Sequence, residues 1–220
     1  ELNNAIASPP RVASFTNEYT TMGYLARIQY DYDEKYFVSA SYRRDASSRF
    51  HPDNRWGNFG SVGLAWLINK ENFMSNVSWI DMLKFKASYG IQGNDNLGNY
   101  YAYADQYSVT NSNGDFAVSF SYKGNKDITW ETSYAFNTGF DFELLGNRLN
   151  GTVEYFNRKT VDLLYNQPVP ISMGYATIPM NVGSIVNQGI EVDLNGVLYK
   201  NNNTILTSAF STLQPLQVQE

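Results

Sequence analysis

The sequence predicts an all-β protein, a section of an antiparallel transmembrane β-barrel with about eight strands. Three observations lead to this fold class. Apolar and polar side chains alternate over segments of about 9 to 11 residues, the length of a tilted strand that crosses a bilayer, whereas soluble strands centre on about 5 or 6. The chain has only 17% charged residues but 15% aromatic residues. The connections between segments are short at one end and long at the other.

The first two strands form a hairpin. Every second side chain is apolar over residues 24–32, and the same alternation returns over 36–43 after a tight turn at 33–35. A period of two places successive side chains on opposite faces of a strand. The polar stretch 44–57 follows, and we expect it to form an outer loop.

Six further strands follow with the same alternation. They are predicted at residues 60–66, 83–89, 131–143, 149–158 and 190–195, with a weaker one at about 204–213 whose register stays open. One short helical turn is expected within 69–82. The spans 91–130 and 159–188 are expected to be long and irregular, and an Asn-rich turn at 201–203 precedes the last strand.

Charge is confined to one face of the first seven strands. The apolar parity of these segments carries none, and the other parity carries Arg27, Asp31, Arg43, Lys84, Lys86, Glu131, Asp141, Glu143, Glu154, Arg158, Glu191 and Asp193. One Arg or Lys on the lipid side near the bilayer centre would cost about 2 to 4 kcal/mol. The segregation therefore favours a barrel with a wet interior. Tyr and Trp also gather at both ends of the apolar rows, as in interfacial girdles.

The lengths of the connections give the strands a direction. Short connections follow the first, fifth and seventh strands, a medium one follows the third, and long ones follow the second, fourth and sixth. Outer-membrane barrels have short periplasmic turns and long extracellular loops. The long connections are therefore predicted to be extracellular.

The composition excludes several kinds of site. With Cys 0 and His 1, the chain has no thiolate zinc site and no site that needs two imidazoles. No nucleophile pattern accompanies His51, so an enzyme is not expected. The net charge of -5 argues against nucleic acid as a partner. The stretch 111–115 lacks the ligand spacing of a calcium loop and is expected to be a turn, so we expect no metal and no cofactor.

Five sequence blocks carry a family resemblance. They are YRRDASSRF at 42–50, LKFKASYGIQGN at 83–94, WET at 130–132, TVEYFN at 152–157 and NVGSIVNQGIE at 181–191. In this order and spacing they resemble the SusC/RagA-like TonB-dependent transporters of the Gram-negative outer membrane, over nearly the whole chain up to about residue 203. The resemblance implies a plugged barrel of about 22 strands, of which residues 1–220 are a middle to later section.

The chain also departs from the family pattern. The N-terminal plug domain and the segment that engages TonB are not among its 220 residues, and the chain begins at Glu1 without a signal segment. Residues 211–220 lack the aromatic last strand of complete outer-membrane barrels, and 214–220 leave the strand pattern. We therefore expect a piece of a longer protein.

The resemblance implies a function in nutrient uptake. Such a transporter would import oligosaccharides or peptides across the outer membrane, with a SusD-like surface lipoprotein as a lid and TonB as the source of energy. The alternative from another class is a soluble β-sandwich that binds carbohydrate. In that protein the apolar rows would be buried between two stacked layers, whereas in a barrel they face lipid.

Aromatic side chains of the outer loops are the candidate ligand contacts. They are Trp56, Tyr100, Tyr101, Tyr103 and Tyr107, whose rings could stack on a sugar or a peptide group, or could instead pack within the loops themselves. The charged residues Arg43, Arg44, Asp45 and Arg49 are expected to form a structural ion-pair cluster. No catalytic residue is predicted.

Overall fold

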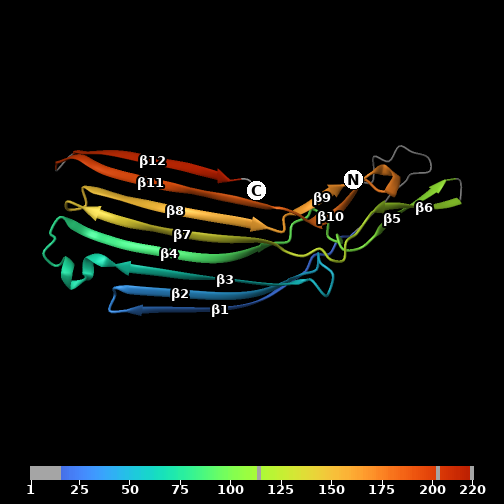
Figure 1. Ribbon diagram of the computed structural model, residues 1–220, viewed down its shortest axis with the longest axis horizontal. Helices are drawn as coiled ribbons and strands as arrows, with labels where there is room; N and C mark the ends of the chain where they lie inside the picture. The colour runs from blue at the N-terminus through green and yellow to red at the C-terminus, as the bar shows by residue number, and fades with distance from the viewer. Residues whose placement is uncertain (1–15, 113–114, 202–203, 219–220) are drawn as a thin grey trace, which may run out of the picture.

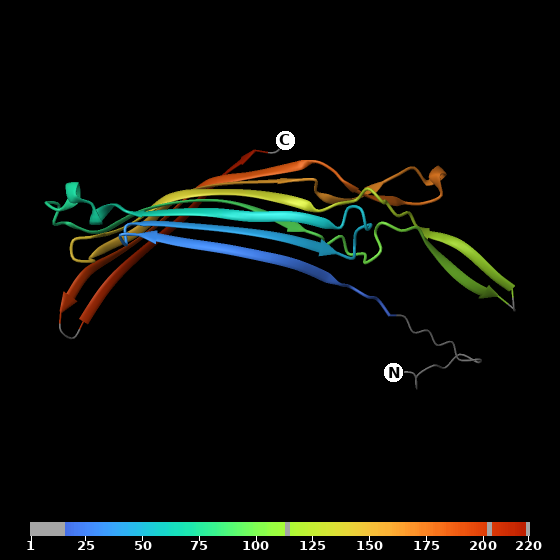
Figure 2. The same cartoon turned by 90° about the horizontal axis from the view of Figure 1, so that it is seen from below.

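The computed structural model describes residues 16–112, 115–201 and 204–218, and its main feature is one eight-stranded sheet in the order β1-β2-β3-β4-β7-β8-β11-β12. All neighbouring strands are antiparallel. The strands are β1 (Thr21–Tyr32), β2 (Tyr36–Ser47), β3 (Trp56–Leu67), β4 (Ile80–Asn94), β7 (Glu131–Leu144), β8 (Leu149–Val161), β11 (Ser184–Asn201) and β12 (Thr204–Val218). Figures 1 and 2 show them as a single curved layer. The predicted fold class is confirmed.

Two small hairpins extend beyond one end of this sheet (Figure 1). One consists of β5 (Gln106–Ser112) and β6 (Asp115–Tyr122), and the other of β9 (Leu164–Pro168) and β10 (Thr177–Asn181). Three single-turn 3-10 helices complete the described elements: η2 (Ile68–Lys70), η3 (Asn72–Met74) and η4 (Ile171–Met173). No helix in the described part of the chain is long and apolar enough to cross a membrane.

The strand register aligns the apolar rows from strand to strand. Val38 of β2 lies opposite Leu64 of β3, and Leu64 lies opposite Ala87 of β4. The same register brings the charged rows together on the other face, where Lys84 lies opposite Asp141. The predicted separation into an apolar and a charged face is therefore confirmed. We call the apolar face outward and the charged face inward.

The outward face remains exposed in this sheet. Ile28 is 73% exposed, and Val62 and Leu64 are each 49% exposed. Among the described residues, no second sheet packs on the eight-stranded one (Figure 2). The alternative of a soluble β-sandwich is therefore wrong, because its apolar rows would be covered by a second layer.

Several strands are longer than their alternation indicates. β3 begins at Trp56 rather than at residue 60, and β11 begins at Ser184 rather than at 190. The connection between β2 and β3 shrinks to residues 48–55, which is shorter than the connection 68–79 between β3 and β4. The expectation of a long loop after the second strand is wrong. Strand ends outside the lipid need no apolar side chains, so alternation cannot mark them.

The spans 91–130 and 159–188 contain the two hairpins and are not irregular throughout, so that expectation is wrong in part. Of the expected turn at 111–115, residues 111 and 112 belong to β5 and residue 115 to β6, and residues 113–114 lie outside the described residues. Residues 202–203 of the expected Asn-rich turn also lie outside them. β12 does not end at 213 but continues to Val218, with Pro215 opposite Gly189. β12 is the last strand of the described sheet, and proline is tolerated on such an edge strand.

The connections at the other end of the sheet are compact. The turn between β1 and β2 has Asp33 and Glu34 in the left-handed region, with φ of 53° and 50°. The helical turn expected within 69–82 is present as η2 and η3. At this end of the molecule the rings of Tyr36 and Trp66 are stacked, with their centres 6.2 Å apart. Both side chains donate hydrogen bonds to Glu71, which fixes the β3–β4 connection against the sheet.

Substitutions at adjacent positions of β3 test the assignment of the two faces. Val62 is outward and in the middle of β3, whereas Ser61 is inward and contacts Ser41 at 2.8 Å between the hydroxyl oxygens. In the full-length protein in lipid vesicles, Val62→Arg should lower the free energy of unfolding by about 2 to 4 kcal/mol, because it places a charge in hydrocarbon. Ser61→Arg, the matched control, should change it much less. Equal losses in urea titrations would contradict the assignment.

Candidate functional site

Two connections at the hairpin end of the sheet share a small buried core. Phe50 from 48–55 and Ala102 and Ile128 from 95–130 are each at most 1% exposed. The ring of Trp130 lies 5.3 Å from the ring of Phe50 and 5.3 Å from that of Phe59. These contacts hold the loops 48–55 and 95–130 against the end of the sheet, so the loops form one body.

The inward ring of Phe59 is accommodated by two glycines. Gly57 on β3 and Gly93 on β4 flank this ring, and a Cβ atom at either position would collide with it. The indole N–H of Trp130 donates a hydrogen bond to the carbonyl oxygen of Arg55 at 3.0 Å. The aromatic core is thus continuous with the inward face at the hairpin end of the sheet.

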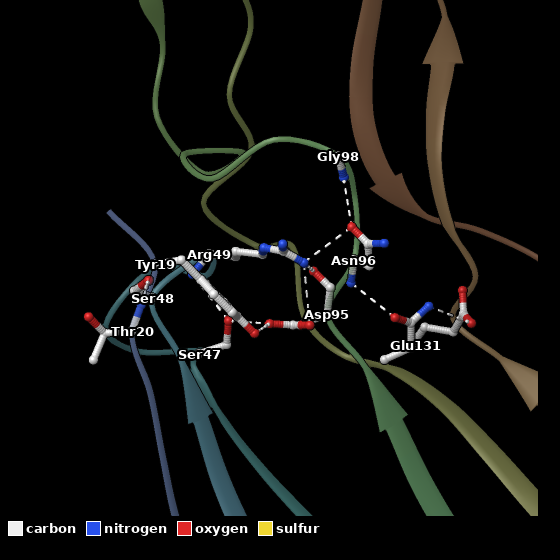
Figure 3. A network of polar contacts seen from close by, with 10 residues as sticks. Tyr19, Thr20, Ser47, Ser48, Arg49, Asp95, Asn96, Gly98 and Glu131 are labelled. Carbon is white, nitrogen blue, oxygen red and sulfur yellow. Dashed lines mark hydrogen bonds and ion pairs between the residues drawn. The ribbon is translucent and has the colours of Figure 1, made fainter. Parts of the chain in front are cut away.

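A polar network beside this core joins the start of β1 to the loops after β2 and β4 (Figure 3). The Oδ2 atom of Asp95 accepts hydrogen bonds from the hydroxyl groups of Tyr19 at 2.8 Å and Ser47 at 2.6 Å. The Nη1 atom of Arg49 donates to the backbone carbonyl of Asp95 at 3.2 Å and to Asn96 at 3.2 Å. Burial, followed by the hydrogen bond to Asp95, raises the pKa of Tyr19.

The guanidinium group of Arg49 also contacts two aromatic rings. It lies 4.4 Å from the ring centre of Tyr19 and 5.3 Å from that of Tyr100. Its side chain is only 14% exposed, and it forms an ion pair with Asp95 at 3.5 Å. Arg49 therefore connects three stretches of chain. A buried arginine of this kind stabilises the loops rather than offering its charge to a ligand.

Amide side chains tie the β9–β10 hairpin to the same body. Asn125 donates to the carbonyl oxygen of Pro179 at 2.9 Å, and Asn181 accepts from the N–H of Thr129 at 2.9 Å. Glu131 accepts hydrogen bonds from Asn94 and from the backbone N–H of Leu164. These asparagines could not be singled out from the sequence, because one Asn among many in a loop carries no distinguishing signal.

The expected ion-pair cluster of the YRRDASSR segment is divided between the two faces. Arg43 and Asp45 form an inward ion pair, and Arg49 pairs with Asp95 instead. Arg44 turns outward and lies over the ring of Trp56 at 5.0 Å. The prediction of structural ion pairing is confirmed for Arg43 and Asp45. It is wrong for a single cluster, because successive residues of a strand point to opposite faces.

The candidate ligand residues do not come together in one site. Trp56 is the first residue of β3 rather than part of a loop, and its ring stacks on outward Tyr24 at 6.1 Å. Tyr100 contacts Arg49 and Tyr19 within the polar network. Tyr101 accepts a hydrogen bond from the backbone N–H of Glu18 at 3.4 Å. These three rings support the structure around them.

Tyr103 and Tyr107 are the two candidates that lie outside these contacts. Tyr103 meets His51 edge to face at 5.9 Å, and both line a groove of about 550 Å³ together with Asp105, Lys123 and Lys126. Tyr107 belongs to β5, where it packs edge to face on Phe120 at 5.4 Å and remains 59% exposed. The surface they occupy combines aromatic rings with charged groups.

The β5–β6 hairpin is amphipathic. Tyr107, Val109, Phe116 and Val118 lie on one side of it by register and are 59%, 64%, 73% and 66% exposed. Serine, threonine, alanine and Asp115 occupy the other side of the two strands by register. Phe120 continues the apolar side toward Tyr175, whose ring centre is 5.9 Å away. The hairpin therefore presents an apolar surface beyond the end of the sheet (Figure 1).

The inward face below the loops is polar and hollowed. Lys86 forms ion pairs with Asp141 at 3.0 Å and Glu154 at 2.9 Å, although β7 lies between β4 and β8. Gly139 stands between Lys86 and Glu154 in the register, so no side chain blocks the reach across β7. Two hollows of about 620 and 660 Å³ lie on this face. Such a wall suits a water-filled interior.

Residues 2–214 match the family model described as TonB dependent receptor-like, beta-barrel. The chain belongs to this family. Within the described residues no three His, Cys, Asp or Glu side chains are grouped to hold a metal ion. The match explains the two faces of the sheet, since a TonB-dependent receptor barrel has lipid outside and an aqueous interior inside.

Curated relatives support the SusC/RagA-like branch. The receptor segment is 40% identical over 189 residues to TonB-dependent receptor P39 of Formosa agariphila, covering 84% of this chain and 18% of that protein. It is 33% identical over 190 residues to TonB-dependent receptor SusC of Bacteroides thetaiotaomicron, covering 83% of this chain and 19% of that protein. The chain thus spans about a fifth of the length of the curated relatives that it matches.

Solved structures give the same result for the fold. The structure of the RagAB peptide transporter matches with a TM-score of 0.82 and 30% identity, covering 91% of this chain and 22% of that chain. The siderophore receptor PirA of Pseudomonas aeruginosa matches with a TM-score of 0.57 and 13% identity, covering 90% of this chain and 35% of that one. The predicted SusC/RagA resemblance, the outer-membrane location and the non-enzymatic class are confirmed.

The receptor's β5–β6 hairpin contains a pH-sensitive contact. Lys123 donates hydrogen bonds to both carboxylate oxygens of Asp105 at 3.0 Å, and Gly124 adds a backbone N–H at 2.9 Å. Lys123 first and Gly124 second lower the pKa of Asp105 below its ordinary 3.8. Because the pKa of Asp105 is lower in the folded state than in the unfolded state, the ion pair stabilises the folded hairpin at pH values above the unfolded pKa. This stabilisation is lost as the pH falls through the folded pKa.

We therefore predict that amides of the hairpin base exchange faster with solvent as the pH falls through the folded pKa of Asp105, which lies below its ordinary value, because Asp105 then becomes protonated. Hydrogen-exchange mass spectrometry of the full-length receptor, corrected for the intrinsic pH dependence of exchange, measures this. In Asp105→Asn the hairpin should already exchange faster at neutral pH, with little further change on acidification. A hairpin whose corrected exchange in the parent protein is independent of pH would contradict the role of this contact.

Proposed function

We propose that this chain forms part of the barrel wall and of the extracellular loops of an importer for oligosaccharides or peptides. The observation that carries the proposal is the combination of a polar, hollowed inward face with loops that are tied into one body above it. A channel wall alone needs no ordered loops. Ordered loops with exposed aromatic rings suit the capture of a ligand before it passes inward.

The relatives support nutrient import as the class of function. SusC is a TonB-dependent receptor by its name, and the RagAB structures are described as those of a peptide transporter and a peptide importer. By analogy, the complete protein acts with a SusD-like surface lipoprotein and receives energy through TonB. This chain covers about a fifth of the length of these relatives, so the coupling to TonB is proposed for the complete protein.

Uptake by cells tests this function directly. Deletion of the gene for the full-length protein should abolish uptake of either labelled oligosaccharides or labelled peptides, and the gene supplied on a plasmid should restore it. Collapse of the proton gradient should stop the restored uptake, because TonB coupling depends on that gradient. Unchanged uptake of both ligand classes in the deletion strain, with redundant receptors also removed, would contradict the proposal.

For ligand contacts we propose Tyr103, which lines the groove of about 550 Å³, and Tyr107, which is 59% exposed on the β5–β6 hairpin. Stacking of an aromatic ring contributes about 0.5 to 1.5 kcal/mol, which corresponds to roughly 2- to 12-fold in affinity. Tyr103→Ala and Tyr107→Ala in the full-length protein should each weaken binding of the imported ligand by this factor in calorimetric titrations. Tyr32→Ala, at the opposite end of β1, is the control and should bind as the parent does. Loss of affinity in all three variants would count against a specific contact.

A further inference from the structure

At the strand ends that lead into the extracellular loops, two of the outward residues paired in the described sheet carry a charge, and both are cationic. They are Arg44 on β2 and Lys159 on β8, as the strand register assigns them. The strands predicted from alternation, at 36–43 and 149–158, end just before these two residues. Both lie close to the ends of their strands, since β2 ends at Ser47 and β8 ends at Val161. These are the ends that lead into the extracellular loops.

The inward face shows that this sign preference is not a general property of the strands. Inward positions carry both signs: Arg27, Asp31, Arg43, Asp45, Lys84, Lys86, Glu131, Asp141, Glu143, Glu154, Arg158, Glu191 and Asp193. If the outward ends of the strands only needed contact with water, a carboxylate would serve as well as an ammonium group. The outward ends therefore differ from the inward ones in charge as well as in polarity.

Arg44 is held in place by aromatic rings. It lies opposite Tyr24 in the register of β1 and β2, and its guanidinium group is 5.0 Å from the ring centre of Trp56. The rings of Tyr24 and Trp56 stack with an interplanar angle of 13°. Arg44 is exposed and forms no ion pair with a carboxylate of the described residues. Its hydrogen-bond donors remain available on the outward side.

Lys159 has a similar setting on the other side of the sheet. It lies opposite Tyr134 of β7 and Val186 of β11, and it is exposed. In the described part of the chain it has no ion-pair partner. Both cations thus stand next to a tyrosine of the extracellular girdle. Tyr and Trp rings mark the level of the lipid head groups in a membrane protein.

We propose that Arg44 and Lys159 bind phosphate groups of anionic lipid in the outer leaflet. Cations at the head-group level attract anionic lipids, and a carboxylate at the same level would repel them. Arginine can engage a phosphate with two parallel N–H donors, whereas lysine acts as a point charge. The two residues are four strands apart, or about 19 Å at a strand spacing of about 4.8 Å, so each binds its own phosphate. This inference does not depend on which nutrient is imported.

Retention of lipid by the purified full-length receptor tests the proposal. The protein is reconstituted in phosphatidylcholine nanodiscs that contain a minor share of lipid A or of dephosphorylated lipid A. The lipid that remains bound after detergent exchange is then counted by mass spectrometry. Arg44→Gln and Lys159→Gln should each lower the retention of lipid A about fivefold, in line with the usual contribution of one basic residue near an anionic surface. Lys159→Arg should retain lipid A as the parent does.

Arg27→Gln is the matched control, because it removes the same charge from the inward face of β1. Its retention of lipid A should equal that of the parent, and the resistance of the folded barrel to denaturation by SDS at room temperature verifies that each variant is folded. Equal retention of dephosphorylated lipid A would overturn the proposal. So would an equal loss in Arg27→Gln. Displacement of lipid A by inorganic phosphate at millimolar concentration would show a site for a soluble anion instead of a lipid.

Discussion

The structure depends on the separation of lipid-compatible and water-compatible side chains onto the two faces of a single sheet. In a membrane the sheet is a single layer, and the backbone N–H and C=O groups of each strand form hydrogen bonds with the two neighbouring strands. Residues such as Ile28 and Val62 therefore stay exposed in this section of the wall. Their burial comes from lipid, and the closure of the sheet depends on further strands of the complete barrel.

At the extracellular end the same chain follows the rules of a soluble protein. Phe50, Ile128 and Trp130 form a small core against the end of the sheet, and Asp95 and Arg49 form an ion pair beside it. This core combines residues from two separate connections, 48–55 and 95–130, and so joins the two loops. The result is a fixed extracellular body joined to a wall whose inward face is polar.

The strands and their two faces could be predicted because one physical rule, the alternation of apolar and polar side chains, repeats along every membrane-crossing segment. Rows such as Val38, Leu64 and Ala87 express this rule in each strand separately. The rule ends where the lipid ends. For this reason the extension of β3 to Trp56 and the β5–β6 hairpin were not predicted, and neither were the partners of Asn125 and Asn181.

The candidate site was predictable only as a region. The sequence by itself determined that aromatic residues concentrate in the long extracellular connections, because composition and connection length are local properties. Only the tertiary structure decided that Tyr100 contacts Arg49, whereas Tyr103 lines a groove and Tyr107 lies on the β5–β6 hairpin. It also continued β2 beyond Arg43 to Ser47, which places Arg44 on the outward face. Those outcomes depend on contacts between segments far apart in the chain, and such contacts leave no periodic trace in the sequence.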